Sequence, residues 1–416
     1  MIDKQPAETD TSAGDDHSLI GRREWLMATG ALVLAGCTGT AASTTPAASA
    51  ATPGPASGGD EIARLMRLAS VPGMSIATVR GADIAVEGYG VRRAGSQDAV
   101  TGDTLFEAAS LSKPVFTAIV LQLAAEGLVD IEKPLGDYLA LPNPADERAK
   151  TITAAHVLSH SGGWRNWRGG RDTTLTSDFP PGSRFSYSGE GFFFLQRVAE
   201  KLTGKGLSRL ARERVFEPLG MRSSSFIWRP ELDAILASPH SNRGVAFDSH
   251  HVRIAKAFRA LPAASSARTL DDWTNDDVER AMPSADANLP VLPNFLVPNA
   301  AASLMTSARD YGTFVRWLLG AGPVNGGRAL LDRMLPQRVA INEALGWGLG
   351  VGVERHEGRQ YFWHWGDNPG FKNFVIVEPA SGSATVMFTN GNAGARVYER
   401  VLRARTGVDH PAFLWI

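Results

Sequence analysis

The chain is short of the features that define several classes of protein. It has 1 Cys among 416 residues, so no intrachain disulfide and no cysteine-rich zinc or iron–sulfur site can form. Charges of opposite sign nearly cancel, with 42 Lys+Arg against 43 Asp+Glu, so no basic surplus points to nucleic acid. No hydrophobic run is long enough to span a bilayer. The composition that remains, 44% hydrophobic and 20% charged, is that of a globular protein.

The first forty residues have the pattern of an export signal. Arg22 and Arg23 precede an uncharged, apolar run that ends at Leu34-Ala35-Gly36-Cys37. A double arginine before such a short apolar run predicts twin-arginine export. The last four residues resemble a bacterial lipobox, which implies cleavage before Cys37 and its lipidation. We therefore expect residues 1–36 to be a twin-arginine lipoprotein signal peptide. A buried cysteine in an N-terminal helix is the alternative, and it would require these features to coincide by chance.

Residues 37–58 predict a flexible tether. They consist mostly of Thr, Ala, Ser, Pro and Gly, and no charged side chain occurs before Asp60. Such a segment buries too little surface to offset its ordering entropy. We expect it to connect a membrane lipid at Cys37 to a folded domain over 59–416, outside the cytoplasm in the periplasm or at the cell surface. Twin-arginine export carries folded chains, so the lack of disulfides is compatible with this location.

Residues 59–416 predict an α+β fold. Strand patterns lie towards both ends and helical patterns between them, which favours one sheet built from both termini with an inserted, mostly helical lobe. Strands are expected over 74–80 and 84–91, as a hairpin, and over 346–354, 360–365, 371–377 and 385–389, as an antiparallel meander. Helices are expected over 60–68, 110–126, 153–160, 191–203, 307–319 and 395–405. Residues 228–300 have little periodicity and indicate a long, variable loop insertion.

Ser110 and Lys113 are the first candidates for chemistry. They stand three residues apart at the start of a predicted helix, so both side chains lie on one face. A helix N-terminus favours an anionic serine and lowers the proton affinity of an amine, and a desolvated lysine can then act as base towards the serine. By itself this spacing is common, and a serine cap beside a solvated lysine is the simpler explanation.

Two later motifs favour the catalytic explanation. Tyr187-Ser188-Gly189 precedes a predicted helix, and His364-Trp365-Gly366-Asp367 ends a predicted strand. In this order, the three motifs resemble those of the penicillin-recognising serine hydrolases, which include class C β-lactamases, D-alanyl-D-alanine carboxypeptidases and related esterases. Similar flanking sequence occurs over 153–163, 217–221 and 346–350. The resemblance covers 60–416 apart from 228–300, and it implies a β-lactamase/transpeptidase-like fold.

The resemblance also implies roles for these residues. Ser110 is expected to be the nucleophile, Lys113 its proton partner and Tyr187 the second acid/base. His364 and Gly366 are expected to line the strand against which substrate lies. The backbone amides of Ser110 and Asp367 would form the oxyanion hole, with no cofactor and no metal. Acyl transfer needs a nucleophile, groups that move protons and donors aimed at the developing oxyanion.

Two positions depart from the family's usual residues. Gly189 stands where these enzymes usually carry Asn, which removes a side-chain amide contact to the substrate and the lysine. His364 stands where β-lactamases usually carry Lys, which removes a fixed cation, although His occurs in some carboxypeptidase, D-aminopeptidase and esterase relatives. Both changes argue against efficient β-lactam hydrolysis. Lys372 could restore a cation near the site, but a solvated strand residue is the simpler expectation.

The expected function is a lipid-tethered serine hydrolase that forms an acyl-enzyme on a β-lactam, a D-amino-acid peptide or amide, or a small ester. The alternatives are an esterase of the same family, or a penicillin-binding or wall-sensing lipoprotein that does not hydrolyse its ligand. The segment 164–171, rich in Trp and Arg, could rim the cleft or be an incidental exposed loop. His250 and His251 lack nearby ligands in the sequence, so no metal is expected there. His156 and His160 are expected to bond to backbone.

Overall fold

The structure, a computed structural model, describes residues 58–170, 173–261, 269–285 and 292–416. The predicted signal peptide and Cys37, with all of the predicted tether except its last residue, lie outside this range. Within it, no helix is both long enough and apolar enough to cross a membrane.

One eight-stranded antiparallel sheet organises the domain, in the order β2-β1-β10-β9-β8-β7-β6-β5. Its strands are β1 Gly73–Arg80, β2 Asp83–Gly90, β5 Val339–Ala340, β6 Leu345–Trp347, β7 Gly352–His356, β8 Arg359–Asn368, β9 Phe371–Glu378 and β10 Ser383–Thr389. Because β1 pairs with β10, the two ends of the domain share one sheet, as the sequence predicts. The single run expected over 346–354 is wrong: a turn separates β6 from β7, closed by Gly348 N–H donating to Val351 O at 2.9 Å.

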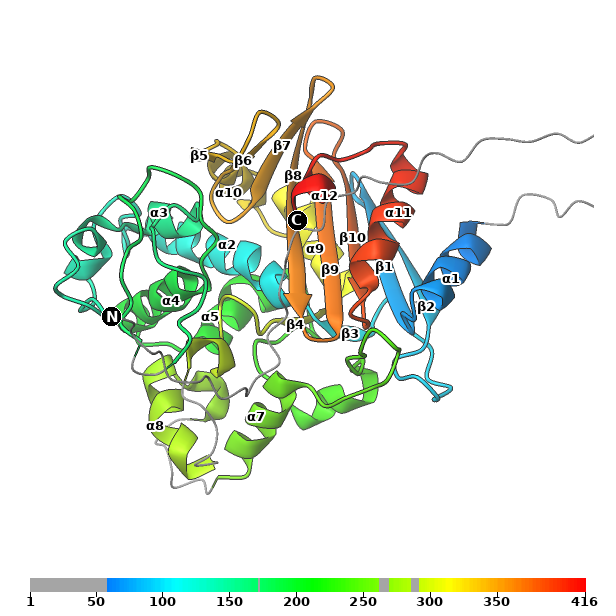
Figure 1. Cartoon of the computed structure of the whole chain (residues 1–416), viewed down its shortest axis with the longest axis horizontal. Coiled ribbons are helices and arrows are strands. Elements are labelled where there is room, and N and C mark those ends of the chain that lie inside the picture. The colour runs from blue at the N-terminus through cyan, green and yellow to red at the C-terminus, as the bar shows by residue number, and fades with distance from the viewer. Residues whose placement is uncertain (1–57, 171–172, 262–268, 286–291) are drawn as a thin grey trace, which may run out of the picture. The chain divides into compact units, whose positions relative to one another are not determined.

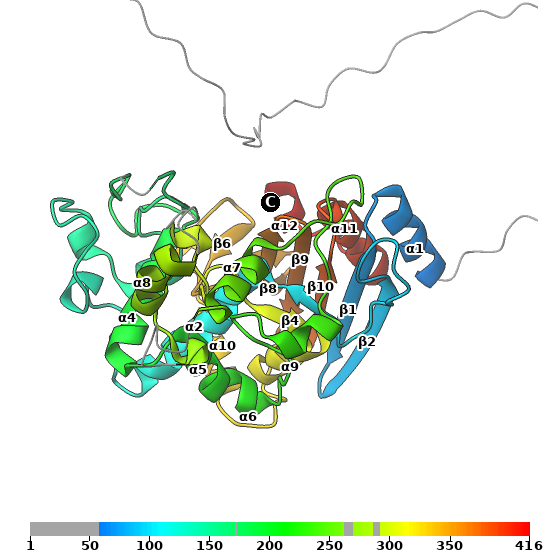
Figure 2. The ribbon, with the colours of Figure 1, turned by 90° about the horizontal axis from the view of Figure 1, so that it is seen from below.

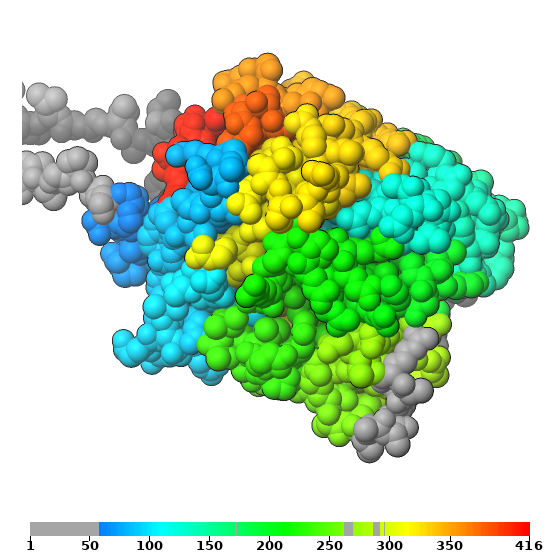
Figure 3. All heavy atoms as spheres, turned by 180° about the vertical axis from the view of Figure 1, so that it is seen from behind, coloured from blue at the N-terminus to red at the C-terminus, as the bar shows by residue number. Residues whose placement is uncertain are grey.

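Helices cover both faces of this sheet (Figure 1). Met74 and Ile76 of β1 pack in the cluster that includes α1 (Gly58–Leu68) and α11 (Gly394–Thr406), whereas Ala77 and Val79 face the larger core on the other side. On that second side, α9 (Ala308–Leu318) lies against β1 and β10. Figure 3 shows the yellow segment that contains α9 between the blue N-terminal strands and the green helical segment.

The helical lobe extends beside the sheet, as Figure 2 shows from below. Its long central helix, α2 (Ser112–Ala125), is buried along most of its length. The other helices of the domain are α3 Ala154–Leu158, α4 Gly189–Thr203, α5 Leu207–Ala211, α6 Glu217–Leu219, α7 His250–Arg259, α8 Asn275–Ala285, α10 Gly327–Met334 and α12 Ala412–Trp415. Short helical turns are η1 Ala109–Leu111, η2 Leu135–Asp137, η3 Ala149–Thr151, η4 Arg212–Phe216, η5 Pro230–Ile235, η7 Leu270–Asp272 and η8 Pro293–Phe295. A two-stranded sheet pairs β3 Leu105–Glu107 with β4 Met305–Ser307.

The expectation of a long loop over 228–300 is wrong. This segment contains α7 and α8, which share a hydrophobic cluster that includes Val252, Phe258 and Val278. Ser249 caps α7 by accepting a hydrogen bond from Val252 N–H at 3.1 Å. The helices were missed because each has only about three turns and polar segments separate them, so neither dominates a sequence window.

Candidate active site

Ser110 lies in a strained turn at the entrance to α2. Ala109, the residue before it, has φ +52°, a left-handed conformation that costs an alanine about 1–2 kcal/mol. The Ser112 hydroxyl donates to Ala109 O at 2.6 Å and accepts from Leu304 N–H at 3.0 Å. The turn is therefore held from inside the protein, and Ser110 remains half-buried at the surface of the core.

Lys113 is buried directly beneath this turn, with 1% of its surface exposed. Its Nζ lies 3.0 Å from Ser110 Oγ and donates to Ala301 O at 2.8 Å. Burial lowers the pKa of Lys113 well below its usual value, and no carboxylate of the described residues is bonded to the amine to offset desolvation. A neutral amine within hydrogen-bond distance of a serine hydroxyl can accept its proton.

Tyr187 reaches the same point from the segment before α4. Its ring lies under the Lys113 amine, 4.7 Å from Nζ to the ring centre, and it packs against His160 at a centroid distance of 4.1 Å. Burial raises the pKa of Tyr187, and the nearby Ser110 hydroxyl opposes this rise. In the described part of the chain, the Tyr187 hydroxyl has no partner within ordinary hydrogen-bond geometry, so it is available to a bound substrate.

His160 packs against Tyr187 and holds the segment on either side of it. Its Nδ1 accepts the Ser188 N–H at 3.0 Å, and its carbonyl accepts the Ser186 N–H at 2.7 Å. His156 likewise accepts the Thr153 N–H through Nδ1 at 3.3 Å. The expected backbone bonding of both histidines is therefore confirmed.

His364 is a neutral imidazole in this site. Its Nδ1 lies 2.7 Å from Trp365 O, and because a carbonyl only accepts, Nδ1 carries a proton; in the neutral ring Nε2 then has the lone pair. Burial, and then the charge of Lys113, lower the pKa of His364 to about 3. Within the described residues, Nε2 has no hydrogen-bond partner and is buried. His364 thus supplies an acceptor where a lysine would supply a cation.

Gly366 and Asp367 bring the end of β8 against the turn that carries Ser110. A Cβ on Gly366 would lie 2.2 Å from Ala108 O, so only glycine permits this approach. The Asp367 carboxylate is paired with Lys372 on β9. The expectation that Lys372 is a solvated strand residue is wrong, since its side chain is 17% exposed and this pair holds it beside the site.

A buried polar network lies next to these residues and was not expected from the sequence. Glu107, at the end of β3, accepts a hydrogen bond from Asn368 Nδ2 at 2.8 Å and lies 3.2 Å from His251 Nδ1. Burial would raise the pKa of Glu107, but His251, Ser249 and Asn368 outweigh it and lower the pKa. His251 therefore does have a carboxylate partner, 144 residues away, which no local pattern could reveal. Among the described residues no group of three or more His, Cys, Asp or Glu could hold a metal ion.

The aromatic and basic segment after Gly163 is only in part an exposed loop. Trp164 is 1% exposed and packs in the core, and Arg168 is paired with Glu190. Arg165 is exposed, and Arg171 lies outside the described residues. Trp167 lies at the edge of a cavity of about 370 Å³ that Asp367 and Asn368 also line.

The site combines a serine with a buried lysine at the start of a central helix. A tyrosine and the end of an antiparallel strand lie around them. This arrangement defines the active-serine class of penicillin-recognising proteins. The chain belongs to the β-lactamase family, whose model matches residues 60–408. The fold is the β-lactamase/transpeptidase-like fold that the sequence predicts.

Among its relatives is "Penicillin-binding protein 4" from Amycolatopsis lactamdurans, 27% identical over 81% of this chain and 85% of the relative. "Esterase EstB" from Burkholderia gladioli is 31% identical over 30% of this chain and 39% of its own length. The solved structure of a "Beta-Lactamase/D-Alanine Carboxypeptidase" from Pseudomonas syringae has a TM-score of 0.64 at 17% identity, covering 83% of this chain and 98% of the other. These relatives include hydrolases and penicillin-binding proteins, so the family relationship indicates a function of the serine-hydrolase type.

Proposed function

We propose that the chain is a serine hydrolase that forms an acyl-enzyme at Ser110 on a small ester or a D-amino-acid peptide or amide, with β-lactams as slower substrates. The observation that carries this proposal is the Lys113 amine, buried and unpaired with any carboxylate, 3.0 Å from Ser110 Oγ. A buried lysine in this position lowers the stability of the fold, and activation of the serine would explain why the chain carries it.

The residues around Ser110 support a two-step reaction. Lys113 takes the proton of Ser110 as Oγ attacks the carbonyl carbon, and the Ser110 and Asp367 amides stabilise the oxyanion. The Tyr187 hydroxyl gives its proton to the leaving group and regains one from Lys113, so no phenolate accumulates. Water then attacks the ester carbonyl, with the same groups moving protons in reverse, and Ser110 is released.

A second candidate is a penicillin-binding protein that is acylated but does not turn over. Gly189 favours it, because no side-chain amide at this position can hold the acyl group during deacylation. The neutral His364 also leaves a substrate carboxylate without the cation that β-lactamases usually carry there.

The two candidates differ in what happens after acylation. Purified residues 59–416 are mixed with p-nitrophenyl butyrate or a fluorescent penicillin, quenched at successive times, and measured by intact mass and peptide mapping. A hydrolase is expected to show a transient butyryl adduct on the Ser110 peptide with continuous nitrophenol release. A stable penicillin adduct without ester turnover supports the second candidate, and an adduct on any other residue contradicts both.

We also propose that a lipid on Cys37 tethers the protein to a membrane outside the cytoplasm. Support comes from the double arginine, the lipobox-like segment and the uncharged residues that follow. Cys37→Ala in the full chain is expected to move the protein from the membrane to the soluble fraction, measured by immunoblotting of separated fractions. Unchanged fractionation, or no uptake of a fatty-acid label by the wild type, contradicts a lipid tether.

A further inference from the structure

Gly189, the residue that departs most clearly from the family's second motif, has no room for a side chain. A Cβ there would lie 2.2 Å from Trp167 Cζ2 and 2.5 Å from Cε2. Real Cβ atoms do not approach other atoms so closely, and a partly buried indole ring packed against two hydrophobic clusters cannot bend away like the end of a lysine. The indole therefore fills the space in which an asparagine side chain at position 189 would begin.

The loop that carries Trp167 is fastened to the start of α4. The backbone N–H of Gly189 donates to Asn166 Oδ1 at 2.8 Å, and that of Glu190 donates to Asn166 O at 2.9 Å. Ser188 Oγ donates to Arg165 O at 3.0 Å. These bonds occupy the first N–H groups of α4, which have no partners within the helix.

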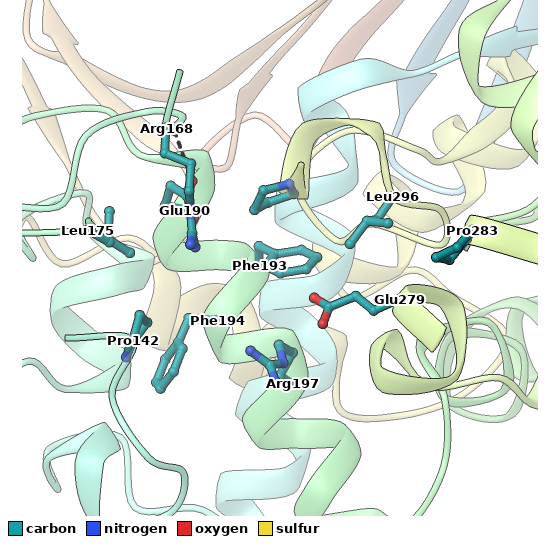
Figure 4. Close-up of a pocket in the computed structure, with 11 residues that line it drawn as sticks. Pro142, Arg168, Leu175, Glu190, Phe193, Phe194, Arg197, Glu279, Pro283 and Leu296 are labelled. Carbon is teal, nitrogen blue, oxygen red and sulfur yellow. Dashed lines mark hydrogen bonds and ion pairs between the residues drawn. The ribbon is translucent and has the colours of Figure 1, made fainter. Parts of the chain in front are cut away.

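An ion pair closes the other side of this loop. Arg168 Nε and Nη2 donate to the two carboxylate oxygens of Glu190, each at 2.8 Å, and the Arg168 N–H also bonds to Glu190 at 2.9 Å. Glu190 is 1% exposed, so this two-pronged pair is shielded from water. Figure 4 shows it at the rim of a separate cavity of about 490 Å³, which Phe193 and Glu279 also line. Trp167 is thus held between two anchored neighbours and does not sit on a free loop.

Trp167 also lines the cavity at the end of β8. That cavity, about 370 Å³, is also lined by Ala302 and Asp367. Ala302 follows the residue whose carbonyl binds Lys113, and the backbone amide of Asp367 is the proposed oxyanion donor. Trp167 therefore occupies the space of a side chain at position 189 and lines the same cavity as the residue whose amide is the proposed oxyanion donor.

We propose that Trp167 determines acyl-group specificity, by placing an apolar wall where related enzymes place a hydrogen-bonding amide. This inference rests on the proposed function at Ser110. An apolar acyl chain gains contact with the indole, whereas an acyl group that carries an amide finds no hydrogen-bond partner on this wall. The site accordingly favours simple aliphatic acyl groups over acylamino groups.

A double-mutant cycle tests whether the two side chains compete for one space. Gly189→Asn alone is expected to lower Tm by about 3 °C or more through overpacking. In the Trp167→Ala background the same substitution is expected to cost almost nothing, so the double variant melts at about the temperature of Trp167→Ala. Gly169→Asn is the matched control, because a Cβ at Gly169 meets no atom within 4 Å in the described structure. Equal Tm for Gly189→Asn and wild type, or the same loss of Tm from Gly189→Asn in both backgrounds, overturns the proposal.

Specificity is tested with two esters that share one leaving group, p-nitrophenyl butyrate and the p-nitrophenyl ester of N-acetyl-D-alanine. The ratio of kcat/KM for the second ester over the first is expected to rise about tenfold from wild type to Trp167→Ala/Gly189→Asn, the worth of one hydrogen bond. An unchanged ratio overturns the specificity role even if the Tm cycle holds. Ester turnover that survives Ser110→Ala contradicts the proposed function instead, and the Tm cycle does not depend on that outcome.

Discussion

Ser110→Ala and Lys113→Met are each expected to reduce kcat for p-nitrophenyl butyrate by about 10⁴-fold or more, and the double variant is expected to be no slower than either. The reason is that the serine and its base act as one unit, so removing either one abolishes the contribution of the other. Steady-state nitrophenol release measures the effect. Lys201→Met, at an exposed position on α4, is the matched control and is expected to keep wild-type rates.

The same lysine variant separates a catalytic role from a structural one. Burial lowers the pKa of Lys113, so the folded chain releases a proton that the unfolded chain binds, and this costs stability at any pH below the ordinary lysine pKa. Methionine fills a similar volume without that cost and gives up the two hydrogen bonds to Ala301 O and Ser110 Oγ, each worth about 1 kcal/mol. Lys113→Met is therefore expected to unfold at the same or a higher urea concentration than wild type. A variant that loses both activity and stability would show that Lys113 mainly holds the fold.

Local spacing is the part of this site that the sequence reveals. Ser110 and Lys113 meet because they stand three positions apart on consecutive helical turns, and Tyr187, His364 and Gly366 are recognisable because each belongs to a short motif. The sheet is recognisable for a similar reason, since its strands alternate between two buried faces in hairpins and a meander.

The parts that the sequence does not reveal depend on contacts between distant segments. Trp167 lies against Gly189 through loop hydrogen bonds that have no periodic signature, although the missing asparagine hints that something else fills its place. Glu107 meets His251 only because α7 folds back over β3. Single residues in irregular loops produce no periodic sequence pattern, so their positions follow from tertiary packing alone.

Acid sensitivity is expected to centre on the histidine at the end of the substrate strand. The folded chain holds His364 neutral down to a pKa of about 3, whereas an unfolded histidine binds a proton below about 6.5. Between these two pH values the unfolded state carries the extra proton, so stability rises with pH and is lost as pH falls from 6.5 towards 3. At pH 4.5 the expected loss from His364 is about 2–3 kcal/mol, or 1.36 kcal/mol for each pH unit.

His160 acts in the same direction, because burial, followed by Lys113 and His364, lowers its pKa well below the usual value. His364→Gln keeps a side chain that can donate to Trp365 O but removes the titration. Urea unfolding at pH 7 and pH 4.5 is therefore expected to show a fall in stability that is about 2–3 kcal/mol smaller in His364→Gln than in wild type. Equal falls in the two proteins would mean that the folded state does not lower the pKa of His364. The ring would then become a cation below about pH 6.5, and the case against efficient β-lactam hydrolysis would lose one of its two supports in acidic solution.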